Sequence, residues 1–223
     1  GAAPSDIDIP LEATIEKEPI TIICSQKGWV RAVRGHSADT KELKFKDGDN
    51  LAFAQQGETT DKILFLGSNG RFYTILADKL PRGRGHGEPI RLMIDLPNDE
   101  DVIAMMIYRP DERVLLASDD GRGFITITDD LVAQTRNGRQ VINVSQDSKA
   151  CICVKVAGDS VAVVGTNRKL LIFPIEELPQ MSKGKGVILQ KYKDGKLADA
   201  KTFEYADGLS WHLKGGRQRT ETE

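Results

Sequence analysis

The sequence holds little of what metal-bound or disulfide-linked proteins need. Its 223 residues include three cysteines and three histidines. No C-x-x-C pair occurs, and Cys151 and Cys153 stand two apart, on the same side of any strand. These spacings give neither a zinc-ligand set nor a disulfide framework. We expect the thiols to be small buried groups in a reducing compartment.

Long apolar runs are also missing. No stretch reaches the roughly 20 apolar residues that a membrane-spanning helix needs. Residues 1–5 carry neither the charged nor the apolar part of a secretion signal, and Gly1 to Pro4 are consistent with a cloning remnant. We expect a cytoplasmic protein with no membrane contact.

The sequence contains no common catalytic motif. Neither G-x-S-x-G nor H-E-x-x-H occurs. The acidic pairs, such as Asp119-Asp120 before Gly121, are typical of turns. We therefore predict no catalytic residue, no metal site and no cofactor in this chain. Propeller glycosidases bring carboxylates together from separate blades, so spacing alone leaves an enzyme open.

What the sequence does contain is a repeated unit: an apolar strand, a Gly or Asn turn, and a second apolar strand. The turn positions are 28, 70, 121, 168 and 216, which are 42, 51, 47 and 48 residues apart. A period of this length predicts an array of β-blades such as a propeller. Elsewhere, short apolar runs bounded by turn residues also predict strands. These runs cover residues 90–94, 103–108, 124–128, 141–144, 152–156, 187–190 and 201–205.

We therefore predict an all-β fold: a single domain over residues 1–223, built as a propeller-like disc of four-stranded antiparallel blades. Five turn units predict five blades. Only seven residues follow Gly216, so the last blade is expected to be irregular or truncated. Alternatively, a ring-closing strand from the acidic N-terminal segment, residues 1–14, completes it.

A basic, glycine-containing loop follows the hairpin in three of the units. The loops are residues 82–87 (Arg-Gly-Arg-Gly-His-Gly), 136–139 (Arg-Asn-Gly-Arg) and 183–186 (Lys-Gly-Lys-Gly). Glycines let backbone N–H groups approach a phosphate closely, and Arg or Lys supplies the charge. Any single loop is explained equally well as a solvated turn. Three loops at equivalent positions favour a function.

The net charge of −2 conceals an uneven distribution. Residues 1–18 hold five acids and one lysine, a balance of −4, whereas residues 183–196 hold five lysines and one aspartate, a balance of +4. Clustered cations are what phosphate binding requires. We take the following as candidate DNA contacts: Arg82, Arg84, His86, Arg136, Arg139, Lys183 and Lys185, with Arg71, Arg122, Arg168, Lys169, Lys214 and Arg217 as secondary candidates.

At three stretches the sequence resembles a known family. Residues 80–89 (Leu-Pro-Arg-Gly-Arg-Gly-His-Gly-Glu-Pro), 117–124 with 129–133, and 178–186, in this order, are similar to the C-terminal domain of the A-type subunit of bacterial topoisomerase IV. The resemblance implies a β-pinwheel, whose blades exchange strands with their neighbours and whose basic rim binds and bends duplex DNA. It also implies a non-catalytic domain that steers which DNA crossing or supercoil the enzyme acts upon.

The same resemblance implies partners outside this chain: the rest of the A-type subunit and the B-type subunit, which holds the ATPase, with ATP and Mg²⁺ serving the whole enzyme. The covalent tyrosine of such enzymes belongs to the N-terminal region of the A-type subunit. Tyr73, Tyr108, Tyr192 and Tyr205 fall in predicted strands here and receive no catalytic role.

Two alternatives stay open. The A-type subunit of DNA gyrase carries a glutamine-arginine-arginine-diglycine-lysine-glycine box that wraps DNA strongly. Residues 82–87 lack its opening glutamine and have His86 in place of its lysine, which favours topoisomerase IV. The second alternative is a propeller that docks proteins and has no DNA contact.

Overall fold

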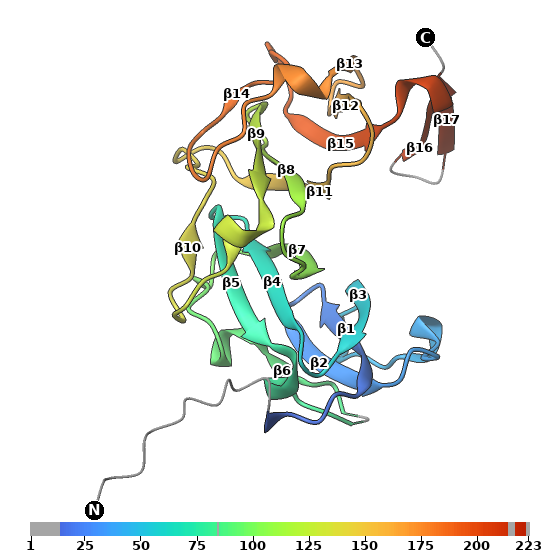
Figure 1. Ribbon diagram of the computed structural model, residues 1–223, viewed down its shortest axis with the longest axis vertical. Coiled ribbons are helices and arrows are strands. Elements are labelled where there is room, and N and C mark those ends of the chain that lie inside the picture. The colour runs from blue at the N-terminus through green and yellow to red at the C-terminus, as the bar shows by residue number, and fades with distance from the viewer. Residues whose placement is uncertain (1–13, 84, 214–216, 222–223) are drawn as a thin grey trace, which may run out of the picture.

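Five antiparallel β-sheets follow one another along the chain in the computed structural model, which describes residues 14–83, 85–213 and 217–221. Figure 1 shows them arranged in an arc, with the sheet of β1 at one end and the β16–β17 hairpin at the other. The predicted all-β architecture is confirmed. Within the described residues, no helix is long and apolar enough to cross a membrane.

Each sheet is built around one of the hairpins that the repeat predicts. The hairpins are β1 (Pro19–Ser25) with β2 (Trp29–Arg34), β4 (Lys62–Gly67) with β5 (Arg71–Leu76), β8 (Arg113–Ser118) with β9 (Arg122–Ile127), β12 (Ser160–Gly165) with β13 (Leu170–Pro174), and β16 (Leu209–Leu213) with β17 (Arg217–Glu221). Their turn residues Gly28, Gly70 and Gly121 have φ values of 82, 79 and 90°, and Arg168 takes the same left-handed conformation at 66°. The predicted fifth turn residue, Gly216, lies outside the described residues.

A third strand pairs with the first strand of each of the first four hairpins. These third strands are β3 (Leu51–Glu58), β7 (Val102–Ile107), β11 (Ala150–Lys155) and β15 (Leu197–Phe203). Each pairing ends in a register shift next to the hairpin turn.

The fourth strand of a sheet comes from further along the chain. β6 (Glu88–Pro89) follows the second hairpin but pairs with β2 of the first. In the same way β10 (Arg139–Gln140) pairs with β5, and β14 (Val187–Ile188) pairs with β9. The second, third and fourth hairpins are therefore each followed by a crossing back to the preceding sheet, which is the strand exchange expected of a β-pinwheel.

The exchange explains why the last two sheets are smaller. Within the described residues, the fourth sheet has three strands in the order β13-β12-β15, and the fifth is the two-stranded hairpin. Among the described residues, no exchanged strand pairs with β13 or β17. The predicted irregular last blade agrees with this arrangement. The alternative of a ring-closing strand near residues 8–15 falls mainly on residues 1–13, which lie outside the described part.

The apolar core is divided among the gaps between successive sheets. Side chains alternate along a strand, so β4 sends Ile63 and Phe65 into one cluster and Leu64 and Leu66 into the next. The same alternation makes β8 and β12 contribute to two clusters each. The central strands are buried on both faces, which explains why they appear in the sequence as continuous apolar runs.

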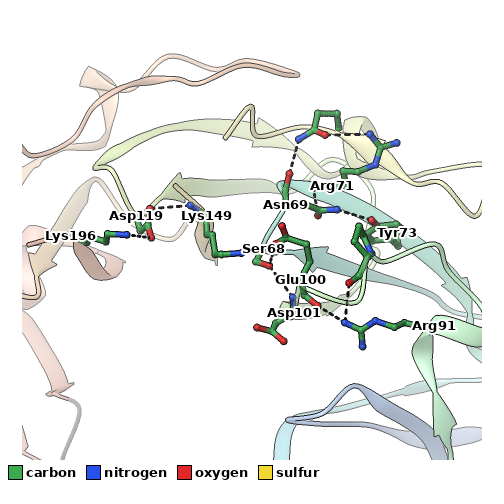
Figure 2. Close-up of polar contacts among 12 residues, drawn as sticks. Ser68, Asn69, Arg71, Tyr73, Arg91, Glu100, Asp101, Asp119, Lys149 and Lys196 are labelled. Carbon is green, nitrogen blue, oxygen red and sulfur yellow. Dashed lines mark hydrogen bonds and ion pairs between the residues drawn. The ribbon is translucent and has the colours of Figure 1, made fainter. Parts of the chain in front are cut away.

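A chain of polar contacts links successive sheets at their turn ends (Figure 2). Lys196 Nζ lies 3.4 Å from Asp119 Oδ2, and Lys149 Nζ lies 3.1 Å from Glu100 Oε2. The Lys149 amide also donates to Asp119 Oδ1 over 3.0 Å. Backbone N–H groups of Ala150 and Leu197 donate to carbonyls of the preceding sheet at 2.9 Å. These contacts fix neighbouring sheets relative to one another.

Some predicted strands are wrong in detail. Residues 90–94 do not form a strand but begin with a 3₁₀ turn, η4 (Ile90–Leu92), because Ile90 and Ile94 are both buried and Pro89 ends the exchanged strand just before them. Of residues 141–144, only Ile142 makes an isolated bridge. Tyr192 lies in a loop, and Tyr205 opens the turn η7 (Tyr205–Asp207), so neither is in a strand.

One glycine precedes each exchanged strand and is required by packing. Gly87, Gly138 and Gly186 have φ values of 81, 72 and 77°. A Cβ on any of them would overlap a backbone carbonyl oxygen of the receiving hairpin; at Gly138 the separation from Phe72 O would be 2.6 Å. The recurrence of a glycine at this place in each loop therefore reflects strand exchange.

We predict that Gly87→Ala lowers the free energy of unfolding by about 1–3 kcal/mol, because alanine at a positive φ is strained and its methyl group would overlap the Val30 carbonyl. Gly85→Ala in the same loop is the control, since a Cβ there meets nothing within 4 Å. Urea unfolding of both variants measures the difference. Equal stability of the two variants would contradict this role for Gly87.

Candidate nucleic-acid interface

The three basic loops lie at the crossings between sheets. Each begins after a hairpin and ends in the exchanged strand, so the exchange places it beside the preceding sheet. The Ala32 amide donates to Pro81 O at 2.8 Å, and the Ile125 amide donates to Pro179 O at 2.9 Å. At the middle crossing, the Ala133 amide donates to Thr74 Oγ1 at 2.9 Å. The three loops therefore occupy equivalent positions along the arc.

The cations of the first loop are partly neutralised. Arg82 lies 3.3 Å from Glu18 Oε2 and 3.1 Å from Asp78 Oδ1, and its side chain is partly exposed. His86 is exposed and borders a hollow lined also by residues 44–47. Arg84 lies outside the described residues. An anionic ligand at Arg82 would therefore compete with two carboxylates.

The second loop carries one paired and one unpaired cation. Arg136 donates to Leu92 O at 2.8 Å and lies 3.4 Å from Asp95 Oδ1. Arg139 is exposed, and no side chain of the described residues pairs with it. Its guanidinium is therefore available to an anion.

Arg71 holds the backbone of this second loop through hydrogen bonds. Its guanidinium donates to the carbonyls of Asn137 and Gly138 at 2.8 and 3.2 Å, and to Gln140 Oε1 at 3.3 Å. The structure thus gives Arg71 a positioning role in the loop. Its assignment as a DNA contact stays a prediction.

The third loop has two lysines without acidic partners among the described residues, and hydrogen bonds hold its backbone in place. The Gly184 amide donates to Val141 O, and Gly184 O accepts from the Asn143 amide, both at 2.9 Å. Residues 141–143 follow the second loop, so these bonds tie the second crossing to the third. Lys183 and Lys185 are exposed, and neither has an acidic partner in the described part of the chain.

The candidate cations on the hairpins are spread over several turns and are not gathered in one loop. Arg122 is half-buried, and its guanidinium has no hydrogen-bond partner among the described residues. Arg168 and Lys169 are exposed at the fourth turn. Arg217 is placed in β17 opposite Leu213, and Lys214 lies outside the described residues.

Sequence reasoning missed Arg31, which is 3% exposed. Its guanidinium donates to Gly85 O in the first basic loop and, at 2.9 Å, to Lys44 O in the loop after β2. It also lies 5.6 Å from the centre of the Phe45 ring. An arginine inside a strand gives no signal in the sequence that it reaches two loops. Trp29 is half-buried and has the Lys46 ammonium 4.0 Å from its ring centre.

Two of the three cysteine thiols are poorly suited to nucleophilic chemistry. Burial raises the pKa of Cys153 to about 12, and burial together with Asp49 raises the pKa of Cys24 to about 12. Both thiols are therefore protonated at neutral pH. Among the described residues, no group of three His, Cys, Asp or Glu side chains could hold a metal ion.

Comparison with known proteins places this fold and its loops in a family. The family model described as the DNA gyrase C-terminal domain, beta-propeller, matches residues 61–109, 112–149 and 159–203, more than half of the chain. The chain belongs to this family of DNA gyrase C-terminal propeller domains.

Its relatives specify the branch of the family. The chain is 47% identical over 213 residues to the A-type subunit of DNA topoisomerase 4 from Rickettsia bellii, covering 96% of the chain and 29% of the relative. It is 46% identical over its full length to the same subunit of Caulobacter vibrioides, again 29% of the relative. The chain thus spans less than a third of the length of these curated relatives.

Solved structures support the same assignment. The E. coli ParC C-terminal domain superposes with a TM-score of 0.80 at 33% identity, covering 91% of this chain and 86% of that one. The DNA gyrase A C-terminal domain gives a TM-score of 0.59 at 17% identity, covering 82% of this chain and 64% of that one, which shows the fold alone. The chain is therefore homologous to the C-terminal domain of the A-type topoisomerase IV subunit, and the resemblance of residues 80–89, 117–124 with 129–133, and 178–186 is confirmed.

We predict that Arg71→Met lowers the free energy of unfolding by about 1–2 kcal/mol, because it removes charge-assisted hydrogen bonds and leaves loop carbonyls unpaired. Arg122→Met is the matched control: Arg122 also follows a turn glycine, but its guanidinium has no such partner among the described residues. Chemical denaturation compares the two. If both substitutions cost the same, the loop bonds of Arg71 contribute nothing.

Proposed function

We propose that this domain binds and bends duplex DNA through the basic loops at its sheet crossings. The observation that carries the proposal is the repeated placement of these loops: strand exchange sets one at each crossing along the arc. Membership of a family of gyrase-type C-terminal domains supports the same role. Lys183, Lys185 and Arg139 are the unpaired cations from which we expect the strongest contacts.

The expected binding is tolerant of DNA sequence. Flexible lysines and exposed arginines on glycine-containing loops suit phosphate oxygens, which carry no sequence information directly. Contacts spread along an arc require the duplex to curve. Such a bend costs on the order of 1–6 kcal/mol over 20 to 30 base pairs, which several phosphate contacts can offset.

In the longer protein, we propose a non-catalytic part for this domain. It would present DNA to the remainder of the A-type topoisomerase IV subunit and to its ATPase partner, where ATP and Mg²⁺ act, and so steer decatenation and supercoil relaxation in the cytoplasm. Tyr73 is fully buried and Tyr192 half-buried, which suits neither for covalent attack on DNA. Burial raises the pKa of Tyr192 to about 12.

A second candidate is gyrase-like wrapping, because the matching family model is named for the DNA gyrase C-terminal domain. The two are separated by sealing a nicked circle in the presence of the protein. Strong wrapping shifts the linking number, whereas a bend without chiral wrapping leaves it near that of the free circle.

We predict that Lys183→Gln with Lys185→Gln weakens binding to duplexes of unrelated sequence alike. Loss of two phosphate contacts should make the slope of log affinity against log salt less negative by about 1.8. Fluorescence anisotropy on duplexes of about 15 and about 45 base pairs, across a salt series, measures affinity and slope together.

The control removes two charges elsewhere. Arg113 and Lys155 lie at the ends of β8 and β11 opposite to the hairpin turn, so Arg113→Gln with Lys155→Gln should leave the slope unchanged. Equal, weak and salt-insensitive binding of both duplexes by the unaltered protein would overturn the proposal and favour a protein-docking module. A loss confined to one DNA sequence would overturn backbone recognition.

Glu18→Gln should strengthen binding, because Glu18 competes with phosphate for Arg82. An exposed ion pair contributes about 0.2–1 kcal/mol, so the gain should be at most about five-fold. Asp207→Asn, which removes an exposed acid from η7, serves as the control. The anisotropy titration measures the DNA affinity of both variants. An unchanged or lower affinity for Glu18→Gln would show that Arg82 is not in the interface.

A further inference from the structure

The first sheet has a basic loop that the sequence repeat does not reveal. In the second to fourth sheets, the connection between the second and third strands contains the exchanged segment. In the first, β2 and β3 are joined by residues 35–50 alone. That connection contains the turn η2 (Thr40–Glu42) followed by Leu43, as η3 (Ala77–Lys79) is followed by Leu80. In both, the leucine amide donates back to the first residue of the turn.

The residues after Leu43 are Lys44-Phe45-Lys46-Asp47-Gly48, at the place where basic loops follow the other turns. Lys44 and Lys46 are exposed, and no acid of the described residues forms an ion pair with either. The Lys46 ammonium rests on the face of Trp29, where it keeps its charge while remaining at the surface. This loop therefore offers two cations.

The end of the loop is anchored. The Asp49 amide donates to Lys46 O at 2.9 Å, and the Asp49 carboxylate accepts from the Lys27 and Asn50 amides at 3.0 and 2.9 Å. Burial alone would raise the pKa of Asp49, but hydrogen bonds from Ser25, Lys27 and Asn50 outweigh it and lower the pKa. These hydrogen bonds thus fix the C-terminal end of the loop.

Arg31 joins this loop to the first exchanged loop. One side of its buried guanidinium donates to Lys44 O and the other to Gly85 O. Because it is only 3% exposed, Arg31 is not itself placed to contact a large ligand. Its fork instead sets the separation of two cationic loops.

Two surface hollows border the joined loops, and Lys44 lines both. The larger, about 850 Å³, is also lined by Arg31, Arg34 and Arg82, with Glu18 and Glu42 as its acids. The smaller, about 660 Å³, is lined by Lys44, Phe45, Lys46, Asp47 and His86. Cations outnumber acids around each hollow, so the surface suits a polyanion.

We propose that residues 44–48 form a phosphate-binding loop of the first sheet, and that Arg31 fixes it beside residues 82–87 so that both loops contact one stretch of DNA backbone. The proposal rests on the DNA-binding function proposed above. It extends that interface to the end of the arc at β1. Lys44 and Lys46 are the contact residues, and Arg31 is a positioning residue.

The test is the anisotropy titration on the longer duplex with Lys44→Gln and Lys46→Gln combined. Affinity should fall several-fold and the salt slope should become less negative by about 1.8, as for loss of two phosphate contacts. The control pair Arg113→Gln and Lys155→Gln should change neither. If the unaltered protein binds steeply with salt and the Lys44, Lys46 variant binds identically, this proposal fails while the proposed function stands. If the unaltered protein does not bind, both fail.

The positioning role of Arg31 is tested with Arg31→Lys, which keeps the charge but loses the guanidinium fork. Amide hydrogen exchange should speed up in residues 44–48 and 85–87, with β1 and β3 protected as before, and DNA affinity should fall. General destabilisation of the sheet would instead raise exchange in β1 and β3. Unchanged exchange in both loops, or faster exchange with unaltered DNA affinity, would overturn the positioning role.

Discussion

The exchanged strand is the constraint on which the rest of this structure depends. Two residues are too few to form a stable strand alone, so each exchange relies on its flanks: a buried leucine such as Leu80 or Leu131 before the loop, and a glycine against the receiving hairpin after it. Packing therefore fixes both ends of the loop, whereas its described cations are exposed.

Burial on both faces of the central strands has a second consequence. Every gap between sheets must be filled by side chains from both neighbours, so the angle between two sheets is set by packing. The polar chain from Lys196 through Asp119 and Lys149 to Glu100 adds a second line of contact at the turn ends. Packing of the core therefore sets the curvature of the arc, and this curvature sets where the loops lie relative to one another.

The sequence was sufficient for features that are local. Apolar runs and turn residues predicted the hairpins, and the period predicted the sheets and the equivalence of the three loops. It could not show which sheet receives each short strand, because residues 88–89 pair with residues almost 60 positions earlier. It also could not show that Arg71 and Arg31 hold loop carbonyls, or that Arg82 is paired. Residues 90–94 have the composition of a strand, and only their packing beside Pro89 makes them a turn.

The pairing of the cations varies along the arc. Arg82 in the first exchanged loop meets two carboxylates, the second loop has one paired and one unpaired arginine, and Lys183 and Lys185 in the third meet none among the described residues. An ion pair at the surface must be broken before its arginine can bind phosphate, whereas an unpaired lysine only sheds water and counterions. On the proposed function, a duplex should therefore engage the third loop first and the end of the arc at β1 last. The net charge of −2 conceals this order, because it does not show that Glu18 and Asp78 pair with Arg82.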